Sequence, residues 1–486
     1  TQSRSSAASD VYKRQTLNSM ALIKSISGIR GTIGGAAGDN LTPQDIVECT
    51  AAFGYWVIQK TNNPKIVVGR DARISGEIVN SLVVSTLRSL GIDVVDLGLS
   101  TTPTVEVAVP MENAGAGIIL TASHNPKQWN ALKLLNDNGE FISAADATEF
   151  LALIEAGNIE YASVDELGSY RKDDTYIEKH INAILSLPLV TIEKVKAKQF
   201  KVVVDCVNST GAISIPPLLE RLGCEVVLIN EAVTGKFAHN PEPLPENLRQ
   251  LSEAVISHRA DLGIAVDPDV DRLAFVSEDG EMFGEEYTLV TVADYILRNT
   301  PKGKSRNTVS NLSSTRALRD VTEKNGGTYS SAAVGEVNVV NQMKVTNAVI
   351  GGEGNGGIIY PELHYGRDAL VGIALVLSQL AEYGKPISWL RRTFPSYVIS
   401  KNKIQLTPEL DLDLIFDKLK DKYKNEELDT IDGLKILFES DWIHLRKSNT
   451  EPIIRIYSES ASEVTANNLA KKIQLDISDL LKNKVV

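Results

Sequence analysis

Three aspartates stand at alternate positions in the segment Leu262–Arg272, directly after a run of apolar and small residues. In extended backbone, residues two apart project to the same side, so this spacing predicts that the carboxylates of Asp267, Asp269 and Asp271 converge. Converging carboxylates repel one another, and a hard divalent cation such as Mg²⁺ relieves that repulsion by taking oxygen ligands. The apolar run predicts a buried strand with the site at its carboxyl end, where open α/β sheets bind ligands. The segment is therefore typical of a metal site.

Two other interpretations of this acidic segment stay open. A calcium EF-hand loop also begins with alternating acidic residues and ends with Glu at position twelve, where Glu278 stands. Its sixth position normally needs Gly for a sharp turn, whereas this chain has Arg272, and Leu273–Val276 is typical of a strand. The segment could also be a solvated acidic turn without metal, since runs of charge are usually exposed.

A second polar segment, Thr121–Pro126, follows the apolar run Ala116–Leu120 and is predicted to be a loop at the end of a strand. Ser123 is expected to be exposed there, with its neighbour His124 directed away from it. A Ser/His hydrolase is a poor interpretation, because the segment is not a G-x-S-x-G nucleophile elbow. The competing structural interpretation is an Asn-Pro turn with a capping serine.

The segment Gly351–Gly357 places five glycines around Glu353 and Asn355. Glycines let a ligand approach the backbone closely, and a carboxylate beside an amide suits the hydroxyls of a sugar. The segment is neither a Walker A loop nor a Rossmann fingerprint. A simple glycine-rich turn is the alternative.

Cations and hydroxyls gather in Arg446–Pro452 and at Arg455. Guanidinium groups together with Ser, Thr and Asn side chains and loop amides form an anion cradle, for which phosphate is the expected guest. The alternative is a polar loop with a surface arginine. Taken together, the four segments indicate an enzyme that transfers phosphoryl groups on a phosphosugar.

Composition narrows the class of protein. With 486 residues the chain is too long for one core, and length alone favours three or four domains. The sequence has 43% hydrophobic and 23% charged residues, as soluble globular proteins do, and lacks the run of about 20 apolar residues that a bilayer span needs. A formal net charge of −12 argues against nucleic acid as the main partner. An anionic substrate must therefore be held by local cations against the overall field.

The cysteines Cys49, Cys206 and Cys224 form an odd set without a C-x-x-C pair. They are expected to be small buried hydrophobes in a reducing cytosol. A catalytic thiol or a soft-metal site is the alternative.

The elements that must position these segments recur three times in the first 340 residues. Each copy has a strand, an amphipathic helix, a glycine and a second strand, which predicts parallel neighbours joined by right-handed crossovers. The first strands are 65–69, 201–205 and 307–312, the helices about 76–90, 211–222 and 314–324, and the second strands 92–95, 225–229 and 328–331. From about residue 395 the pattern changes to a helix over 411–424, strands around 434–438 and 452–457, and a final helix over 461–482.

These motifs resemble those of the α-D-phosphohexomutase superfamily. T-A-S-H-N-P at 121–126 resembles its phosphoserine loop, D-P-D-V-D-R at 267–272 its metal loop, G-E-G-N-G-G at 352–357 its sugar loop and R-K-S-N-T-E-P at 446–452 its phosphate loop. Further similarity lies in S-G-I-R-G at 27–31, G-R-D-A-R-I-S-G at 69–76 and N-P-E-P at 240–243. The resemblance covers the chain from Met20 onward.

The resemblance implies an α/β protein in which three related α/β domains with mixed sheets and a C-terminal α+β domain surround a central cleft. The implied domains are 20–172 with the phosphoserine loop, 173–280 with the metal loop, 281–392 with the sugar loop and 393–486 with the phosphate loop. Residues 1–19 are polar and Ser-rich, without the apolar stretch of a secretory signal. We expect them to be a disordered extension outside the fold, with a transit peptide as the alternative.

The resemblance also implies roles for individual residues. Ser123 would be phosphorylated, and its phosphoryl group would join Asp267, Asp269 and Asp271 around Mg²⁺. Arg272, and Arg30 from the first loop, would steady the same phosphate. Lys133 is the first candidate for the general acid/base and His124 the second. The residues implied to bind substrate are Glu353, Gly354 and Asn355 for the sugar hydroxyls, and Arg446, Ser448, Asn449, Thr450 and Arg455 for the phosphate.

The implied cycle has two phosphoryl transfers. Phosphorylated Ser123 gives its phosphoryl group to a hexose phosphate, and Ser123 then takes the other phosphate from the resulting 1,6-bisphosphate. Positioning and charge stabilisation are most of what the protein supplies to such a reaction. Mg²⁺ is the implied cofactor, and a hexose 1,6-bisphosphate the implied activator. The implied partner is a small hexose or hexosamine phosphate, with no nucleic acid and no membrane, and the enzyme would be a cytoplasmic monomer or homodimer.

The sugar loop departs from many relatives, which carry Ser or His where this chain has Asn355 and Gly357; a base at position 357 is therefore excluded. Val334–Asn338, together with the sugar loop, is similar to the phosphoglucosamine and archaeal-type branches. This favours glucosamine 6-phosphate as substrate, with glucose or mannose phosphates as the alternative. A phosphosugar phosphatase and a non-catalytic sugar-phosphate-binding protein are the interpretations from other classes.

Overall fold

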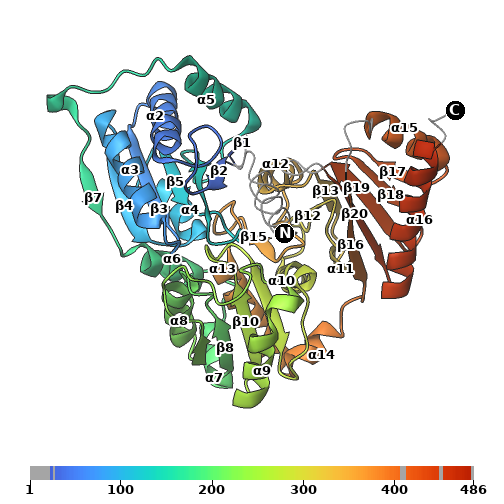
Figure 1. Cartoon of the computed structure of the whole chain (residues 1–486). Coiled ribbons are helices and arrows are strands. Elements are labelled where there is room, and N and C mark those ends of the chain that lie inside the picture. The colour runs from blue at the N-terminus through green and yellow to red at the C-terminus, as the bar shows by residue number, and fades with distance from the viewer. Residues whose placement is uncertain (1–21, 26–27, 406–411, 448–452, 483–486) are drawn as a thin grey trace, which may run out of the picture. The chain divides into compact units, whose positions relative to one another are not determined.

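The computed structural model of the chain describes residues 22–25, 28–405, 412–447 and 453–482 (Figure 1). The chain forms two compact units. The first takes the described residues up to Ser186 together with Lys201–Ala254 and Ile264–Asp271. The second takes Leu187–Phe200, Val255–Gly263 and the described residues from Arg272 onward. The expected extension at 1–19 and three of the predicted phosphate ligands, Ser448, Asn449 and Thr450, lie outside the described residues.

A seven-stranded mixed sheet organises most of the first unit, in the order β1-β2-β6-β5-β3-β4-β7. Its central strand β3 pairs in parallel with β4 and β5, whereas β5–β6, β6–β2 and β2–β1 are antiparallel. The strands are β1 Ile23–Ser25, β2 Gly28–Thr32, β3 Lys65–Arg70, β4 Asp93–Leu99, β5 Ala116–Leu120, β6 Trp129–Leu135 and β7 Tyr170–Lys172. β5 is buried along its whole length, as its continuous apolar run predicts.

Helices cover this sheet and close its core. The largest, α2, begins after Thr42, which forms a reciprocal capping box with Asp45, and buries Phe53 and Trp56 in the core. The helices of this part are α2 Pro43–Lys60, α3 Gly76–Ser89, α4 Thr102–Met111, α5 Ala144–Ala156 and α6 Tyr176–Leu185, with the short η1 at Val164–Glu166.

The second strand–helix–strand copy is β8 (Lys201–Asp205), α8 (Gly211–Arg221) and β9 (Glu225–Ile229), with β8 and β9 parallel. The chain then passes through η2 (Pro245–Asn247) and α9 (Arg249–His258) to β10 (Leu262–Val266), whose five residues are all buried. β10 ends immediately before the three aspartates, as its apolar run predicts.

In the second unit, a mixed sheet has the order β13-β12-β14-β15, with β12 parallel to β13 and β14, and β14 antiparallel to β15. The apolar helix α13 is buried at nearly every position and is capped by Asp368, whose side chain accepts from two backbone N–H groups. The elements are α7 Ile192–Lys198, β11 Leu273–Ser277, α10 Glu285–Asn299, β12 Thr308–Asn311, α11 Ala317–Lys324, β13 Tyr329–Ala332, α12 Glu336–Thr346, β14 Ile350–Glu353, β15 Gly357–Ile359, α13 Ala369–Tyr383 and α14 Ile387–Arg391.

The C-terminal part of the second unit is an antiparallel sheet in the order β16-β20-β19-β18-β17 with two helices. Its apolar core is rich in isoleucine from β18, β19 and β20 and from α16. The elements are β16 Val398–Gln405, α15 Leu412–Lys422, β17 Glu427–Asp429, β18 Leu434–Leu437, β19 Trp442–Lys447, β20 Ile453–Ser460 and α16 Glu463–Lys482. This is the predicted α+β character.

Most predicted elements agree with the structure to within a few residues. The helix predicted over 314–324 begins only at Ala317, because Ser314 donates its backbone N–H to Asn311 O in a turn. β16, β17 and β19 were not predicted. Cys49 and Cys206 are buried, and burial raises the pKa of each thiol to about 12, which fits small hydrophobes rather than reactive thiols. Within the described residues, no helix is both long and apolar enough to cross a membrane.

An ion pair between the half-buried His239 and the buried Asp205 gives the first unit a pH-dependent stability. His239 Nε2 lies 2.9 Å from Asp205 Oδ2, and its Nδ1 lies 2.7 Å from Asn240 O. Each ring nitrogen faces one oxygen acceptor, and only the doubly protonated imidazolium can donate to both. Burial lowers the pKa of His239, but Asp205 and the Asn240 carbonyl raise it by more, so the net shift is upward.

We therefore predict that His239→Gln destabilises the protein by about 1.5 kcal/mol at pH 6 and by clearly less at pH 9. Because the folded pKa lies above the unfolded value of about 6.5, the stabilisation is complete below that pH and is lost as the pH rises through the folded pKa. Urea unfolding at both pH values measures it. The exposed His258, changed to Gln, is the control, and equal losses at both pH values would contradict the prediction.

Candidate active site

The acidic segment forms a buried turn rather than extended backbone. Val270 has φ +61° and donates its N–H to Asp267 O at 3.1 Å, and the N–H of Asp271 donates to Asp267 Oδ1 at 3.1 Å. The extended geometry expected from the alternate spacing is therefore wrong, because Val270 reverses the chain. The convergence is nonetheless present: oxygens of Asp267, Asp269 and Asp271 all lie within 4.8 Å of one another.

This geometry excludes both alternatives for the segment. All three aspartates are 0% exposed, so a solvated acidic turn is ruled out. In the second unit, both carboxylate oxygens of Glu278 accept hydrogen bonds from Ser388, one from its N–H and one from its hydroxyl. This carboxylate therefore does not act as the twelfth-position ligand of an EF-hand loop. Leu273–Ser277 is a strand, as predicted.

Ser123 lies in the loop after β5 with its side chain on the aspartates. Its Oγ donates to Asp267 Oδ2 at 2.5 Å, and the residue is 4% exposed, so the expectation of an exposed serine is wrong. His124 Nδ1 is 3.4 Å from Ser123 Oγ, so the expectation that His124 is directed away is wrong as well. The reason is local: Ser123 is left-handed, with φ +49°, and the alternation of side chains in extended backbone does not apply.

Lys133 enters the same cluster from β6. Its Nζ donates to Asp269 Oδ2 at 2.7 Å and to Asp271 Oδ2 at 3.2 Å, and its side chain is almost fully buried. Thr102, at the start of α4, donates its hydroxyl to Asp269 Oδ2 at 2.5 Å and its N–H to Asp269 O at 2.9 Å. Burial raises the pKa of Asp269, but Lys133 and the hydrogen bonds lower it by more, so the carboxylate is ionised.

The residues of this cluster fit a divalent cation. Three carboxylates and one ammonium leave a formal charge of −3 + 1 = −2 in a buried site. Asp269 Oδ1 is buried and has no hydrogen-bond partner in the part of the chain that the structure describes, as expected of a ligand atom. Oxygen donors of this kind are those that Mg²⁺ prefers. Thr102 was missed by sequence reasoning, because Thr-Thr-Pro before a helix is equally typical of an ordinary N-cap.

Two arginines were expected to steady a phosphate on Ser123. Arg30 was expected on a loop, but it lies on β2, where antiparallel pairing aligns it with Ala131 of β6. Its NH1 donates to Asn125 Oδ1 at 3.0 Å, which brings it to the Ser123 loop. Arg272 is buried and begins the second unit, directly after Asp271.

In the second unit, Glu353 is held in a buried polar cluster at the end of β14. Its Oε1 accepts from Asn311 Nδ2 at 2.9 Å and from Gly335 N at 3.2 Å, and its Oε2 from Arg367 NH1 at 3.0 Å. Arg367 also pairs with Glu336 at 2.9 Å. The orientation of the Glu353 carboxylate is therefore fixed by the protein. Asn311, Glu336 and Arg367 were not predicted, since each lies outside the glycine-rich motif.

The glycine at position 354 is required by the protein itself. A Cβ on Gly354 would overlap the carboxylate of Glu286, and the Gly354 N–H donates to Ser314 Oγ at 2.9 Å. Burial raises the pKa of Glu286 to about 8. Asn355 is half-buried and its Oδ1 accepts the N–H of Gly357 at 3.1 Å.

The two described arginines of the predicted phosphate loop are cross-strand neighbours. Arg446 on β19 is registered with Arg455 on β20. Arg446 Nε lies 3.2 Å from Asp432 Oδ2. Like charges placed directly opposite each other are unfavourable unless an anion lies between or beside them. Asp432 offsets part of this repulsion, and the two guanidinium groups side by side keep the cationic character that an anion site needs.

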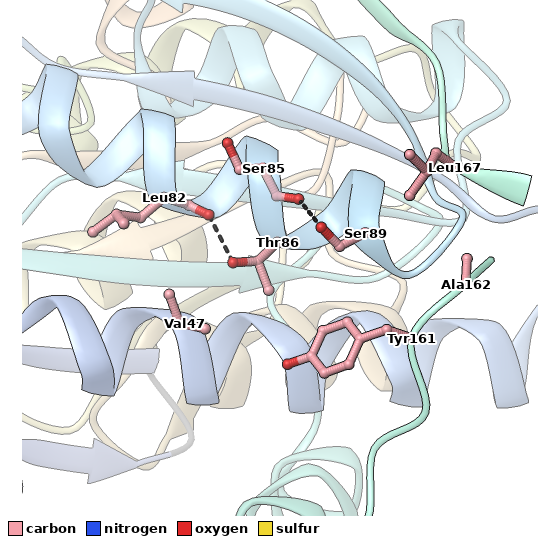
Figure 2. A pocket seen from close by; sticks show the side chains of 8 residues that line it. All are labelled: Val47, Leu82, Ser85, Thr86, Ser89, Tyr161, Ala162 and Leu167. Carbon is pink, nitrogen blue, oxygen red and sulfur yellow. Dashed lines mark hydrogen bonds between the residues drawn. The ribbon is translucent and has the colours of Figure 1, made fainter. Parts of the chain in front are cut away.

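An apolar groove elsewhere in the first unit carries none of this chemistry. Figure 2 shows it beside α2 and α3 and the segment 161–167, with the hydroxyls of Thr86 and Ser89 bonded to their own helix. None of its lining residues has a carboxylate, an imidazole or a cation. The chemistry of the first unit is concentrated at Ser123 and the aspartates instead.

Comparison with known proteins agrees with this site. Sequence models of the phosphoglucomutase/phosphomannomutase family match four segments in order: α/β/α domain I at 22–159, domain II at 175–280, domain III at 284–397 and the C-terminal domain at 407–475. A protein of Thermococcus kodakarensis named phosphoglucomutase/phosphomannomutase is 37% identical over 90% of this chain and 95% of its own length. A probable phosphoglucosamine mutase of Methanopyrus kandleri is 34% identical over 91% of this chain and 95% of its own length.

The solved structures agree. A crystal structure of a phosphoglucomutase/phosphomannomutase family protein from Burkholderia thailandensis has 27% identity and a TM-score of 0.80, covering 96% of this chain and 97% of that one. The four-domain α/β architecture and an intramolecular phosphotransferase of the isomerase class follow from these matches. The chain belongs to the phosphoglucomutase/phosphomannomutase family of the α-D-phosphohexomutases, which confirms the predicted resemblance.

The charge of the aspartate cluster leads to a test of metal binding. We predict that Mg²⁺ at about 100 times its dissociation constant stabilises the protein by about 2.7 kcal/mol, and that Asp269→Asn abolishes most of this gain. Without Mg²⁺ the variant should be less stable than the natural protein, because it loses the buried ion pair with Lys133. Thermal unfolding with and without Mg²⁺ measures both effects. The exposed Asp137, changed to Asn, is the control, and an undiminished Mg²⁺ response in Asp269→Asn would contradict the site.

Proposed function

We propose that the protein interconverts glucosamine 6-phosphate and glucosamine 1-phosphate, with Ser123 as the phosphorylated residue and Mg²⁺ as cofactor. The observation that carries the proposal is the hydrogen bond of 2.5 Å from Ser123 Oγ to Asp267, inside a buried group of three aspartates. A serine hydroxyl in that position is ready to carry a phosphoryl group beside a metal ion. The ion neutralises charge on the transferring phosphoryl group and so favours the reaction.

The residues of the chain divide the remaining work. Arg30 and Arg272 steady the phosphate on Ser123, and Lys133 moves the proton of the attacking hydroxyl, with His124 as the second candidate. Glu353 and Asn355, with the close backbone at Gly354, read the sugar hydroxyls. Arg446 and Arg455, together with Ser448, Asn449 and Thr450, hold the phosphate that is not reacting. A hexose 1,6-bisphosphate is the activator, because it can phosphorylate Ser123.

Two observations bear on the choice of sugar. The 34% identical relative named probable phosphoglucosamine mutase, and the match of Val334–Asn338 to that branch, favour the amino sugar. The 37% identical relative named phosphoglucomutase/phosphomannomutase favours glucose or mannose phosphates, which are the second candidate. The thiols of Cys49, Cys206 and Cys224 suit a reducing cytosol. That the protein is a monomer or a homodimer stays a prediction. The domain boundaries near residues 172, 280 and 392 stay predictions as well.

Turnover of glucosamine 6-phosphate, glucose 1-phosphate and mannose 1-phosphate, compared at equal concentration, tests the choice of substrate. The reactions contain Mg²⁺ and a trace of hexose 1,6-bisphosphate, and isomerised product and free phosphate are followed together. We expect the amino sugar to be preferred without release of phosphate. Preference for glucose or mannose would select the second candidate, and release of phosphate without isomer would identify a phosphatase.

Ser123→Ala tests the phosphorylated residue. We expect the turnover number to fall by at least about 1000-fold, because no other hydroxyl can carry the phosphoryl group between the two transfers. Mass spectrometry of the protein after incubation with glucose 1,6-bisphosphate should show one added phosphoryl group in the natural protein and none in the variant. Phosphorylation of the variant to the same extent would assign the role to another residue.

A pair of substitutions at Lys133 separates proton transfer from charge. Arginine keeps the positive charge but cannot release its proton, whereas methionine lacks both properties. If Lys133 moves the proton, Lys133→Arg and Lys133→Met should lose turnover to a similar degree, by about 100-fold or more. If Lys133 only orients the aspartates, Lys133→Arg should keep most of the activity. Circular dichroism and Mg²⁺ binding of both variants provide the folding control.

A further inference from the structure

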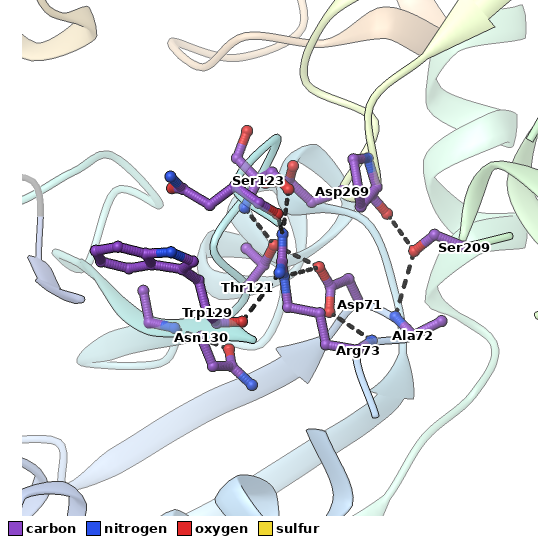
Figure 3. Close-up of polar contacts among 12 residues, drawn as sticks. Asp71, Ala72, Arg73, Thr121, Ser123, Trp129, Asn130, Ser209 and Asp269 are labelled. Atoms are coloured by element: carbon purple, nitrogen blue, oxygen red, sulfur yellow. Dashed lines mark hydrogen bonds and ion pairs between the residues drawn. The ribbon is translucent and has the colours of Figure 1, made fainter. Parts of the chain in front are cut away.

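Arg73 is a buried arginine that holds the loop of Ser123 by its backbone. It lies between β3 and α3 and is 1% exposed. The guanidinium donates to four carbonyl oxygens of the segment 123–129, and Figure 3 shows Arg73 beside Ser123 and Trp129. NH1 donates to Pro126 O and to Trp129 O, both at 2.9 Å, and NH2 donates to Asn125 O at 2.7 Å and to Ser123 O.

The fifth N–H of Arg73 is engaged by Asp71, which also reaches Ser123 from the other side. Asp71 Oδ2 accepts from Arg73 Nε at 3.1 Å and from Thr121 Oγ1 at 2.7 Å. Thr121 Oγ1 in turn accepts the N–H of Ser123 at 2.9 Å. Both the N–H and the C=O of Ser123 are therefore fixed by one buried network that begins at Asp71.

The same segment reaches the metal loop. Ala72, between Asp71 and Arg73, donates its N–H to Ser209 Oγ at 3.3 Å. Ser209 Oγ donates to the backbone oxygen of Pro268 at 2.7 Å, and Pro268 lies between Asp267 and Asp269 in the chain. Three consecutive residues thus contact both loops that meet at Ser123 and the aspartates.

Without a cation, the geometry of this loop would be unfavourable. Ser123 is left-handed at φ +49°, a conformation that L residues rarely adopt. Four carbonyl oxygens directed at one point also repel one another. The planar guanidinium of Arg73 satisfies all of them at once, which a lysine ammonium with three donors cannot do. The position of Ser123 Oγ at 2.5 Å from Asp267 therefore depends on Arg73.

We propose that Arg73 is the positioning residue of the Ser123 loop, and that its five hydrogen bonds keep Ser123 Oγ aligned for phosphoryl transfer. Arg73 would touch neither substrate nor metal. The proposal rests on the proposed function of Ser123 as the residue that carries the phosphoryl group. A displacement of about 1 Å at a reacting atom can reduce the rate by about 100-fold, so the loss of this network should be visible in turnover.

The test compares Arg73→Lys with a variant that weakens the same unit without touching the loop. Val79→Ala is the matched control, because Val79 lies on α3 with its side chain in the core and is 1% exposed. For each variant we would measure urea unfolding, the turnover number, KM and the rate at which glucose 1,6-bisphosphate phosphorylates Ser123. We expect Arg73→Lys to lose about 100-fold in turnover and in phosphorylation rate while KM changes little.

A purely structural role would give a different result. Arg73→Lys would then lose no more activity than Val79→Ala at equal loss of stability, and that outcome would overturn the proposal. If Arg73→Lys does not fold, Thr121→Val tests the same network, since it removes both the acceptor of the Ser123 N–H and the hydroxyl donor to Asp71; unchanged turnover in that variant would also overturn the proposal. Absence of turnover in the natural protein with every sugar phosphate would instead overturn the proposed function.

Discussion

The repulsion among three buried carboxylates is the constraint on which the first unit depends. The three aspartates are fully buried at the end of a buried strand, where an unpaired charge is strongly unfavourable: Asp267, Asp269 and Asp271. Lys133 and the hydroxyl of Thr102 offset part of that charge, and a divalent cation fits what is left. The strands β5, β6 and β10 and the start of α4 all deliver a side chain or a loop to this point, so the fold is organised around it.

A related solution recurs in the second unit at Glu353. Its carboxylate is buried, but Asn311, Gly335 and Arg367 supply donors to both oxygens. A carboxylate held in this way keeps one orientation, which recognition of a sugar hydroxyl needs, because no rotamer has to be fixed when the ligand binds. The glycine-rich loop also serves the protein itself, since Gly354 makes room for Glu286. In both units, residues outside the sequence motifs hold the functional side chains in place, as Thr102 does in the first unit and Asn311 and Arg367 do in the second.

Three of the wrong expectations at the site share one physical cause. Ser123 was expected to be exposed with His124 directed away, and the aspartates were expected in extended backbone. Both arguments assume regular backbone, whereas Ser123 and Val270 have positive φ and change the direction of the chain. Such conformations are unfavourable for non-glycine residues, so local propensity does not predict them. They persist because tertiary contacts hold them: Arg73 binds the carbonyls around Ser123, and the hydroxyls of Ser209 and Thr210 donate to Pro268 O beside Val270.

The sequence by itself determined the chemical types at the site and the elements that carry them. Apolar runs predicted β5 and β10, and the spacing of three aspartates predicted a metal site, because periodicity and composition are local properties. Only the tertiary structure decided which groups meet. Thr102 reaches Asp269 across 167 positions, and Arg73 meets the Ser123 loop 50 positions away. Such contacts follow from how strands and loops pack, and no local pattern in the chain encodes them.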